Sequence, residues 1–384
     1  QIARDVAAET FVLLKNEGNL LPLKKQGKIA LIGPLADTRD NIAGTWSVAQ
    51  APEKYTTIKE AMEKALKGKA TLLYAQGSNI WRDRELQKNG ELGKSITWGD
   101  EVKMKNEALQ IAKEADVIVC AMGETADMSG ECASRTNLEM PDVQQELLAE
   151  LAKTGKPVVL LNFAGRPTVL SWENEHIPAI MNVWFGGSEM GDALCDVIFG
   201  DKVPSGKLTT SMPKTTGQEP LYYNHQNTGR PVPDDNQKFA KFASNYLDVS
   251  NGPLYPFGYG LSYTTFEYGD LKLSSHEVCM DNWKITATIN IKNTGSRDAD
   301  EIVQLYIRDM VASISRPVKE LKGFQRIHLA AGESRDISFD ITPEMLKFYN
   351  AELKHVIEPG DFQIMVGGNS KEVKTQNLTV KKHP

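Results

Sequence analysis

The side chains best suited to chemistry lie in one polar stretch, residues 123–141. Its charged residues include Glu124, Asp127, Glu131 and Arg135. Carboxyl groups can donate and accept protons during a reaction. The stretch contains few residues that could build a core. An apolar run at 116–122 precedes the stretch, and a helix pattern follows it at 141–154. Because open α/β sheets place their chemistry in loops at the ends of central strands, we expect a functional site here.

The first half of the chain alternates predicted strands with predicted helices. The strands are expected at 28–33, 70–75, 116–122, 157–163 and 179–185, and the helices at 57–68, 105–115, 141–154 and 190–198. Thr57 and Glu60 have the spacing of a capping box, which predicts a helix start at this point. Because the strands are nearly continuous apolar runs, we expect an α/β fold with a mostly parallel sheet that helices cover on both faces.

The pattern changes after residue 211. Residues 212–264 are rich in Pro, Gly, Asn and aromatic residues and have no clear helical or strand periodicity. The aromatic residues at 253–263 predict that the segment packs against the rest of the protein. From residue 265 onward, apolar and polar residues alternate. The alternating runs lie at 285–292, 303–307, 337–341 and 362–366. Short alternating strands separated by turn signals predict an all-β, antiparallel sandwich.

The bulk composition excludes several classes of function. A chain of 384 residues predicts two domains, and its net charge of −6 argues against a nucleic-acid partner. No apolar run reaches about 18 residues, so no membrane span is predicted. The six histidines have no ligand spacing and the four cysteines form no C-x-x-C motif, so we predict no metal and no cofactor. Cys120 and Cys195 are expected to be buried.

Five short motifs, in order along the chain, resemble glycoside hydrolase family 3. They are VLLKNEGNLLPL at 12–23, GGSEMG at 186–191, PSGKL at 204–208, PFGYGLSY at 256–263 and KELKGF at 319–324. Each glycine-rich motif by itself is weak evidence for the family. Together the five motifs cover nearly the whole chain and are specific.

The resemblance implies the C-terminal part of a β-glucosidase-like enzyme. Such members of the family carry an N-terminal (β/α)8 barrel, an α/β sandwich and a fibronectin type III-like domain, and the barrel is absent from these 384 residues. We therefore expect a helical linker at 1–22, an α/β sandwich at 23–211, a connecting segment at 212–264 and a fibronectin type III-like β-sandwich at 265–384. The chain begins without Met and within a helix pattern, which indicates removal of upstream sequence.

The resemblance also assigns roles to the polar loop. In the family, the barrel supplies an aspartate nucleophile, and the acid/base usually lies in the corresponding loop of the α/β sandwich. Ser129-Gly130-Glu131 matches that loop, which implies that Glu131 is the acid/base. Gly130 permits an unusual backbone turn. Glu124 is the nearest rival, but at the end of a strand it is expected to bind backbone or to position the loop.

Arg135 and Ser129 are the candidate substrate-binding residues. Arg135 can pair with Glu124 or Glu131, or contact the sugar of the leaving group. Ser129 can bind the loop backbone or the substrate. For both residues, a purely structural role is therefore the alternative to substrate binding.

The implied function is retaining exo-hydrolysis that releases terminal, non-reducing β-D-glucose from a β-linked oligosaccharide or glucoside. Glu131 serves as the acid/base and the barrel supplies the Asp nucleophile, so this chain alone is expected to be inactive. One alternative is a non-catalytic carbohydrate-binding or scaffold fragment. Another is the same family with β-xylosidase or N-acetyl-hexosaminidase specificity. A periplasmic or secreted location is an expectation from the family alone.

Overall fold

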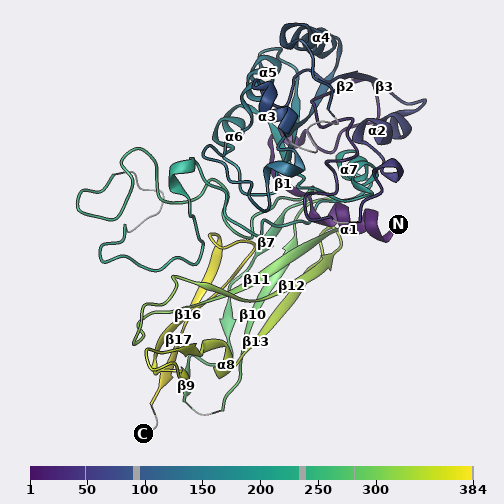
Figure 1. Cartoon of the computed structure of the whole chain (residues 1–384). Coiled ribbons are helices and arrows are strands. Elements are labelled where there is room, and N and C mark those ends of the chain that lie inside the picture. The colour runs from purple at the N-terminus through teal and green to yellow at the C-terminus, as the bar shows by residue number, and fades with distance from the viewer. Residues whose placement is uncertain (48, 90–95, 233–238, 281, 383–384) are drawn as a thin grey trace. The chain divides into compact units, whose positions relative to one another are not determined.

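A computed structural model describes residues 1–47, 49–89, 96–232, 239–280 and 282–382. The chain divides into two compact units (Figure 1). The first unit comprises Gln1–Lys207, Pro213–Gly217 and Gly260–Tyr263, and the second comprises Leu208–Met212, Gln218–Tyr259 and Thr264–Pro384. Neither unit is one continuous stretch of chain. The domain boundaries expected at 22, 211 and 264 stay predictions.

The first unit is built on a six-stranded sheet. In spatial order its strands are β1 (Val12–Asn16), β6 (Ala179–Asn182), β5 (Val158–Phe163), β4 (Val117–Gly123), β2 (Lys28–Ile32) and β3 (Thr71–Ala75). β1 runs antiparallel to β6, and every other neighbouring pair is parallel. The prediction of a mostly parallel sheet is therefore confirmed. β1 comes from the segment that the sequence predicts to be a linker.

Helices cover both faces of this sheet (Figure 1). They are α1 (Ile2–Thr10), α2 (Ile58–Leu66), α4 (Glu101–Glu114), α5 (Asp142–Ala152) and α7 (Met190–Ile198), with the shorter α3 (Arg84–Asn89) and α6 (Ser171–His176). α7 contacts α1 and α2, whereas α4 contacts α5, β2 and β3. Within the described residues, no helix is long and apolar enough to span a membrane.

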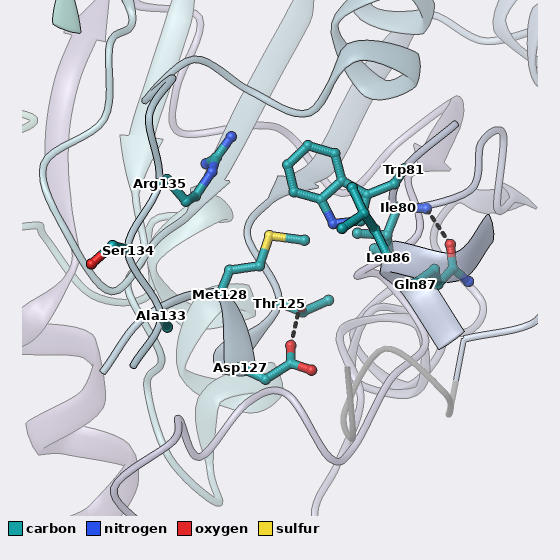
Figure 2. A pocket seen from close by; sticks show the side chains of 10 residues that line it. All are labelled: Ile80, Trp81, Leu86, Gln87, Thr125, Asp127, Met128, Ala133, Ser134 and Arg135. Atoms are coloured by element: carbon teal, nitrogen blue, oxygen red, sulfur yellow. Dashed lines mark hydrogen bonds between the residues drawn. The ribbon is translucent and has the colours of Figure 1, made fainter. Parts of the chain in front are cut away.

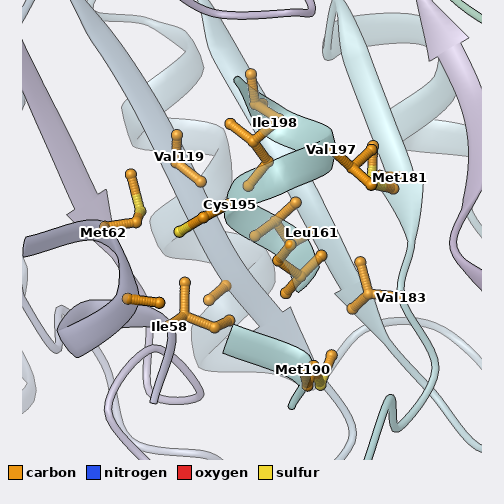
Figure 3. Packing of buried hydrophobic residues seen from close by; sticks show 14 of the residues in the cluster. Ile58, Met62, Val119, Leu161, Met181, Val183, Met190, Cys195, Val197 and Ile198 are labelled. Carbon is orange, nitrogen blue, oxygen red and sulfur yellow. The ribbon is translucent and has the colours of Figure 1, made fainter. Parts of the chain in front are cut away.

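One apolar core joins α2 and α7 to the sheet. Figure 3 shows Ile58 of α2 and Val197 of α7 near Val119 and Leu161, which project from the strands. All four side chains are at most 1% exposed. Full burial of such a side chain contributes about 1.5–3 kcal/mol, so this core fixes the sheet and therefore the ends of its strands.

The predicted capping box at the start of α2 is confirmed. The Thr57 hydroxyl accepts a hydrogen bond from the Glu60 amide at 3.2 Å, and the Glu60 carboxylate accepts one from the Thr57 amide at 3.0 Å. Arg39 forms an ion pair with the same carboxylate. The pair of capping bonds satisfies two amides that the helix itself cannot.

The second unit is a β-sandwich, as predicted. One sheet has the order β13-β10-β7, with β8 also paired to β10, and the other has the order β12-β11-β16-β17-β9. Its strands are β7 (Phe266–Tyr268), β8 (Lys272–Leu273), β9 (Glu277–Cys279), β10 (Ile285–Asn293), β11 (Ala299–Asp309), β12 (Glu320–Leu329), β13 (Ser334–Ile341), β16 (Gly360–Gly367) and β17 (Val373–Lys381). A short helix, α8 (Pro343–Leu346), precedes the β14 (Phe348–Tyr349) and β15 (His355–Val356) ribbon. Pairing is antiparallel except between β9 and β17.

Alternation within these strands points one set of side chains into the core. The apolar members of β10 that the sequence predicts to face inward are all buried, namely Ile285, Ala287, Ile289 and Ile291. The segment before the sandwich has little regular structure. Its two ends are packed, whereas most of the described residues between 222 and 248 are exposed. Met212 pairs with Tyr255, and Tyr223 stacks on Phe257 with ring centroids 4.2 Å apart.

A buried carboxyl group in α6 makes the stability of the first unit sensitive to pH. Glu173 is 2% exposed, and burial raises its pKa to about 7, with the charge of Glu139 adding to the effect and His176 opposing it. The folded chain therefore retains a proton at pH values where the unfolded chain has lost it. Stability falls as pH rises from about 4.5 to about 7.

Glu173→Gln should remove this dependence, because the amide stays neutral at every pH. The stability of the variant relative to the wild type should increase by on the order of 3 kcal/mol between pH 4.5 and pH 8. Denaturant unfolding at the two pH values measures the difference. Glu175→Gln, an exposed neighbour on α6, is the matched control. An equal effect of both substitutions at both pH values contradicts the account.

Candidate active site

The candidate loop begins where β4 ends. Gly123 has a φ of +129°, and a Cβ at this position would lie 2.1 Å from the Phe163 carbonyl oxygen. Only glycine fits so close an approach. The next amide, that of Glu124, donates to the same carbonyl at 2.8 Å. The start of the loop is therefore tied to the end of the neighbouring strand β5.

The Glu124 carboxylate is the electrostatic centre of the loop. Its side chain is 1% exposed, and two arginines approach its Oε1 atom. Arg135 donates to that oxygen at 2.7 Å, and the Nε of Arg166 lies 3.2 Å away. The backbone amide of Gly165 reaches the other oxygen at 3.4 Å. A carboxylate this deeply buried needs such partners, because burial of an unpaired charge is costly.

Arg166 connects this buried charge to both sides of Glu131. Its Nη2 donates to the carbonyl oxygens of Met128 and Ala133. These two carbonyls bracket residues 129–132, so one guanidinium closes the base of the segment that carries Glu131. Charge-assisted hydrogen bonds of this kind are stronger than neutral ones, which makes Arg166 a clamp on the loop.

Residues 41–46 hold the other side of the loop. The buried Asn41 side chain accepts from the Ala126 amide at 3.0 Å. The Thr45 hydroxyl lies 3.0 Å from the Ser129 carbonyl oxygen and also reaches that of Ala126. Gly130 has a φ of +99°, a region that favours glycine. The turn before Glu131 is therefore fixed by backbone conformation and by contacts.

Glu131 itself extends into solvent. The residue is exposed, and within the described part of the chain its carboxyl group has no hydrogen bond or ion pair. Cys132, the next residue, is exposed with a φ of +58°. The loop thus presents an uncommitted carboxyl group on a backbone that its neighbours hold in place.

The two predicted substrate-binding residues lie in the same loop, in different surroundings. Ser129 is 7% exposed, and its hydroxyl lies 3.5 Å from the Ala126 carbonyl oxygen. Arg135 pairs with Glu124 and donates a hydrogen bond to the Glu139 carbonyl oxygen at 2.9 Å. Its guanidinium carbon lies over the Trp81 ring, 5.1 Å from the ring centroid. Both therefore have structural partners. Their contact with substrate stays a prediction.

A small pocket of about 210 Å³ opens beside the loop (Figure 2). Apolar side chains form much of its wall, and in Figure 2 Met128 extends toward Trp81. Thr125 and Asp127, which share a hydrogen bond of 2.5 Å, line the pocket together with Arg135. The pocket combines an aromatic surface with a few polar groups, as small-molecule sites do.

Arg166 is a residue of the candidate site that the sequence pattern did not identify. It lies directly after β5, the strand next to β4, and the ends of parallel neighbours meet at one edge of the sheet. That rule would have placed Arg166 beside the loop. The sequence alone could not show that its guanidinium binds the two carbonyls on either side of Glu131.

Neither a metal-binding cluster nor a disulfide is found in the described part of the chain. Among residues 1–47, 49–89, 96–232, 239–280 and 282–382, no group of three or more His, Cys, Asp or Glu side chains could hold an ion. Both cysteines expected to be buried, Cys120 and Cys195, are buried and unpaired.

Comparison with known sequences identifies relatives over nearly the whole chain. Residues 11–263 match the glycosyl hydrolase family 3 C-terminal domain, and residues 301–370 match the fibronectin type III-like domain. The "Periplasmic beta-glucosidase" of Salmonella typhimurium is 46% identical over 375 residues, which are 97% of this chain and 49% of that protein. A "Beta-xylosidase" of Formosa agariphila is 37% identical over 389 residues, which are 99% of this chain and 50% of that protein.

Solved structures agree with these matches. The crystal structure of the β-glucosidase from Listeria innocua in complex with isofagomine superposes with a TM-score of 0.87 at 36% identity. The match covers 99% of this chain and 49% of that one. The chain thus spans about half the length of the relatives that it matches.

Arg166→Ala should loosen the loop and destabilise the first unit. It removes one of the two cations beside the buried Glu124 and leaves the Met128 and Ala133 carbonyls without their donor. Because breaking a buried pair is costly, we expect a loss of about 3 kcal/mol. Hydrogen exchange of amides 129–134 should also become faster.

Two variants serve as controls for this prediction. Arg135→Ala removes the other cation but leaves the carbonyl clamp, so exchange at 129–134 should change less. Arg82→Ala removes a half-exposed arginine whose ion pairs lie at the surface, and it should cost less than about 1 kcal/mol. Unchanged exchange at 129–134 in Arg166→Ala contradicts the clamp.

Proposed function

This chain belongs to glycoside hydrolase family 3, and we propose that it supplies the general acid/base of an exo-acting, retaining β-glucosidase. Glu131 is the acid/base, and the aspartate nucleophile comes from an N-terminal (β/α)8 barrel outside this chain. The observation that carries the proposal is the state of Glu131: an exposed carboxyl group without partners among the described residues, on a loop held by Arg166, Thr45 and Asn41.

The proposed mechanism uses the two carboxyl groups in two displacements. In the first, the aspartate attacks the anomeric carbon while Glu131 donates its proton to the glycosidic oxygen, and the leaving group departs as an alcohol. In the second, Glu131 takes a proton from water as the water oxygen attacks the same carbon and releases the aspartate. The carboxyl groups of such a pair lie about 5–5.5 Å apart, so the barrel must approach the loop closely.

The geometry of the loop suits both steps. A general acid must lie within hydrogen-bond reach of the oxygen that it protonates, and small displacements reduce the rate strongly. The clamp at Met128 and Ala133 limits such displacement, while exposure leaves the carboxyl group open to substrate. One carboxyl group cannot complete a double displacement, so this chain alone should not hydrolyse glycosides.

The proposed substrates are β-linked oligosaccharides or glucosides, cleaved at the non-reducing end to release glucose. The name of the Salmonella relative supports glucose, whereas that of the Formosa relative supports xylose as a second candidate. In the proposed enzyme the barrel binds the released sugar. The barrel therefore determines whether glucose or xylose is preferred. Activities of the barrel-containing protein toward aryl β-glucoside and aryl β-xyloside measure the preference, and a higher kcat/KM for the xyloside would reverse our assignment.

Arg135 and Ser129 are proposed to border the leaving-group side of the site. Arg135 lines the small pocket next to Trp81, which supports a contact with the departing sugar or alcohol. The buried Ser129 contributes through the shape of the turn before Glu131. A periplasmic location is proposed from the name of the Salmonella relative. Recovery of the complete protein in the cytoplasmic fraction alone would contradict it.

Glu131→Ala in the barrel-containing protein should reduce kcat/KM for a β-linked disaccharide by about 10²–10⁴-fold, because the sugar leaving group needs protonation. An aryl glucoside whose leaving group departs unprotonated should lose much less in its first step. Steady-state kinetics with both substrates measure the difference. Glu139→Ala, an exposed carboxylate at the far end of the same loop, should retain activity on both. Wild-type turnover of the disaccharide by Glu131→Ala would rule out the assignment.

A further inference from the structure

The second unit contains a groove lined by aromatic and basic side chains. Two adjoining cavities, of about 240 and 480 Å³, lie among residues 208–212, 218–259 and 264–384. They share the lining residues His225, Asn251, Val318, Lys319 and Lys371. Because five residues border both cavities, we treat the two as one groove.

One end of the groove is aromatic. Tyr222 and Tyr246, which line it, are 62% and 41% exposed. Tyr223 lies beside them and is fixed, since its ring stacks on Phe257 and its hydroxyl accepts from the Leu321 amide at 3.2 Å. Exposed tyrosines offer a flat apolar face and a polar hydroxyl, which suits ligands that have both kinds of surface.

The rest of the groove is cationic. Its basic side chains are those of His225, Lys319, Lys371 and Arg308. None of the described lining residues is Asp or Glu, although the whole chain has a net charge of −6. Arg308 is half-buried, and its guanidinium has no ion pair or hydrogen bond within the described ranges. A guanidinium in this state is suited to bind a carboxylate through two hydrogen bonds.

The walls of the groove are attached to the strands of the β-sandwich unit. The Val318 amide donates to the His225 carbonyl at 2.9 Å, and the Lys319 ammonium donates to the Ser370 carbonyl at 2.6 Å. The Ser370 amide in turn donates to the Phe257 carbonyl at 2.9 Å. These bonds join the irregular segment to the loops that follow β11 and β16, so the backbone that borders the groove is held at these points.

We propose that this groove binds an oligosaccharide that carries carboxylates, that is, a chain containing uronic acid residues. The tyrosines contact the faces of the sugar rings, and the Arg308 guanidinium binds a carboxylate. A single-stranded nucleic acid also combines flat rings with anionic groups, and a comparison with single-stranded DNA distinguishes the two ligands. All the lining residues of the groove lie in the second unit.

Calorimetric titration of the 384-residue chain with a trisaccharide of galacturonic acid tests the proposal. We expect saturable binding that weakens several-fold when NaCl rises from about 50 mM to about 500 mM. A neutral trisaccharide of β-1,4-linked glucose should bind at least about tenfold more weakly, because it lacks the charge-assisted bonds.

Two substitutions locate the binding in the groove. Arg308→Ala should weaken galacturonate binding about tenfold, and Tyr222→Ala should weaken it several-fold. The matched controls are Lys354→Ala and Tyr349→Ala, exposed residues of the same unit that do not line the groove. Thermal unfolding confirms that each variant is folded, and Arg308→Lys should retain part of the affinity.

Three results would overturn the proposal. The first is the absence of galacturonate binding by the folded wild-type chain. The second is equal affinity for the neutral trisaccharide, which would indicate a site for sugar rings alone. The third is binding that Tyr222→Ala leaves intact and that single-stranded DNA matches, which would indicate a general polyanion site.

Discussion

The buried Glu124 carboxylate is the interaction on which the candidate site depends. A charge that is 1% exposed is stable only with partners, and its partners here are the guanidinium groups of Arg135 and Arg166. Each arginine also binds loop carbonyls, Arg166 those of Met128 and Ala133, and Arg135 that of Glu139. One buried anion thereby orders two cations, and these two cations shape the loop between β4 and α5.

The sheet makes this arrangement possible. β4 and β5 are parallel neighbours, so the segments that follow them emerge at the same edge. Glu124 follows one strand and Arg166 follows the other, which brings together two residues 42 positions apart in sequence. The apolar core between α2, α7 and the strands fixes that edge. Stability of the core and precision of the loop are therefore linked.

Sequence reasoning recovered most of the fold and part of the site. Period-two alternation identified four strands of the β-sandwich, β10, β11, β13 and β16, and the Thr57 and Glu60 pair identified the start of α2, because these signals are local. The pairing of β1 with β6 could not be predicted, since it joins segments that are far apart in sequence. The same limit applies to Arg166: its role depends on which two carbonyls its guanidinium reaches, and only the folded chain defines them. Glu124 was expected to position the loop, and its contacts agree with that expectation.

In the proposed function, two carboxyl groups seven residues apart have opposite roles: Glu124 holds the loop and Glu131 reacts. Chemical rescue by azide in the barrel-containing protein tests this division most directly. With an activated aryl β-glucoside, Glu131→Ala should accumulate the glycosyl-enzyme, and azide, which needs no general base, should restore turnover and give β-glucosyl azide. Failure of azide to accelerate a slow but folded Glu131→Ala enzyme, or an α-glucosyl azide product, would contradict the central claim.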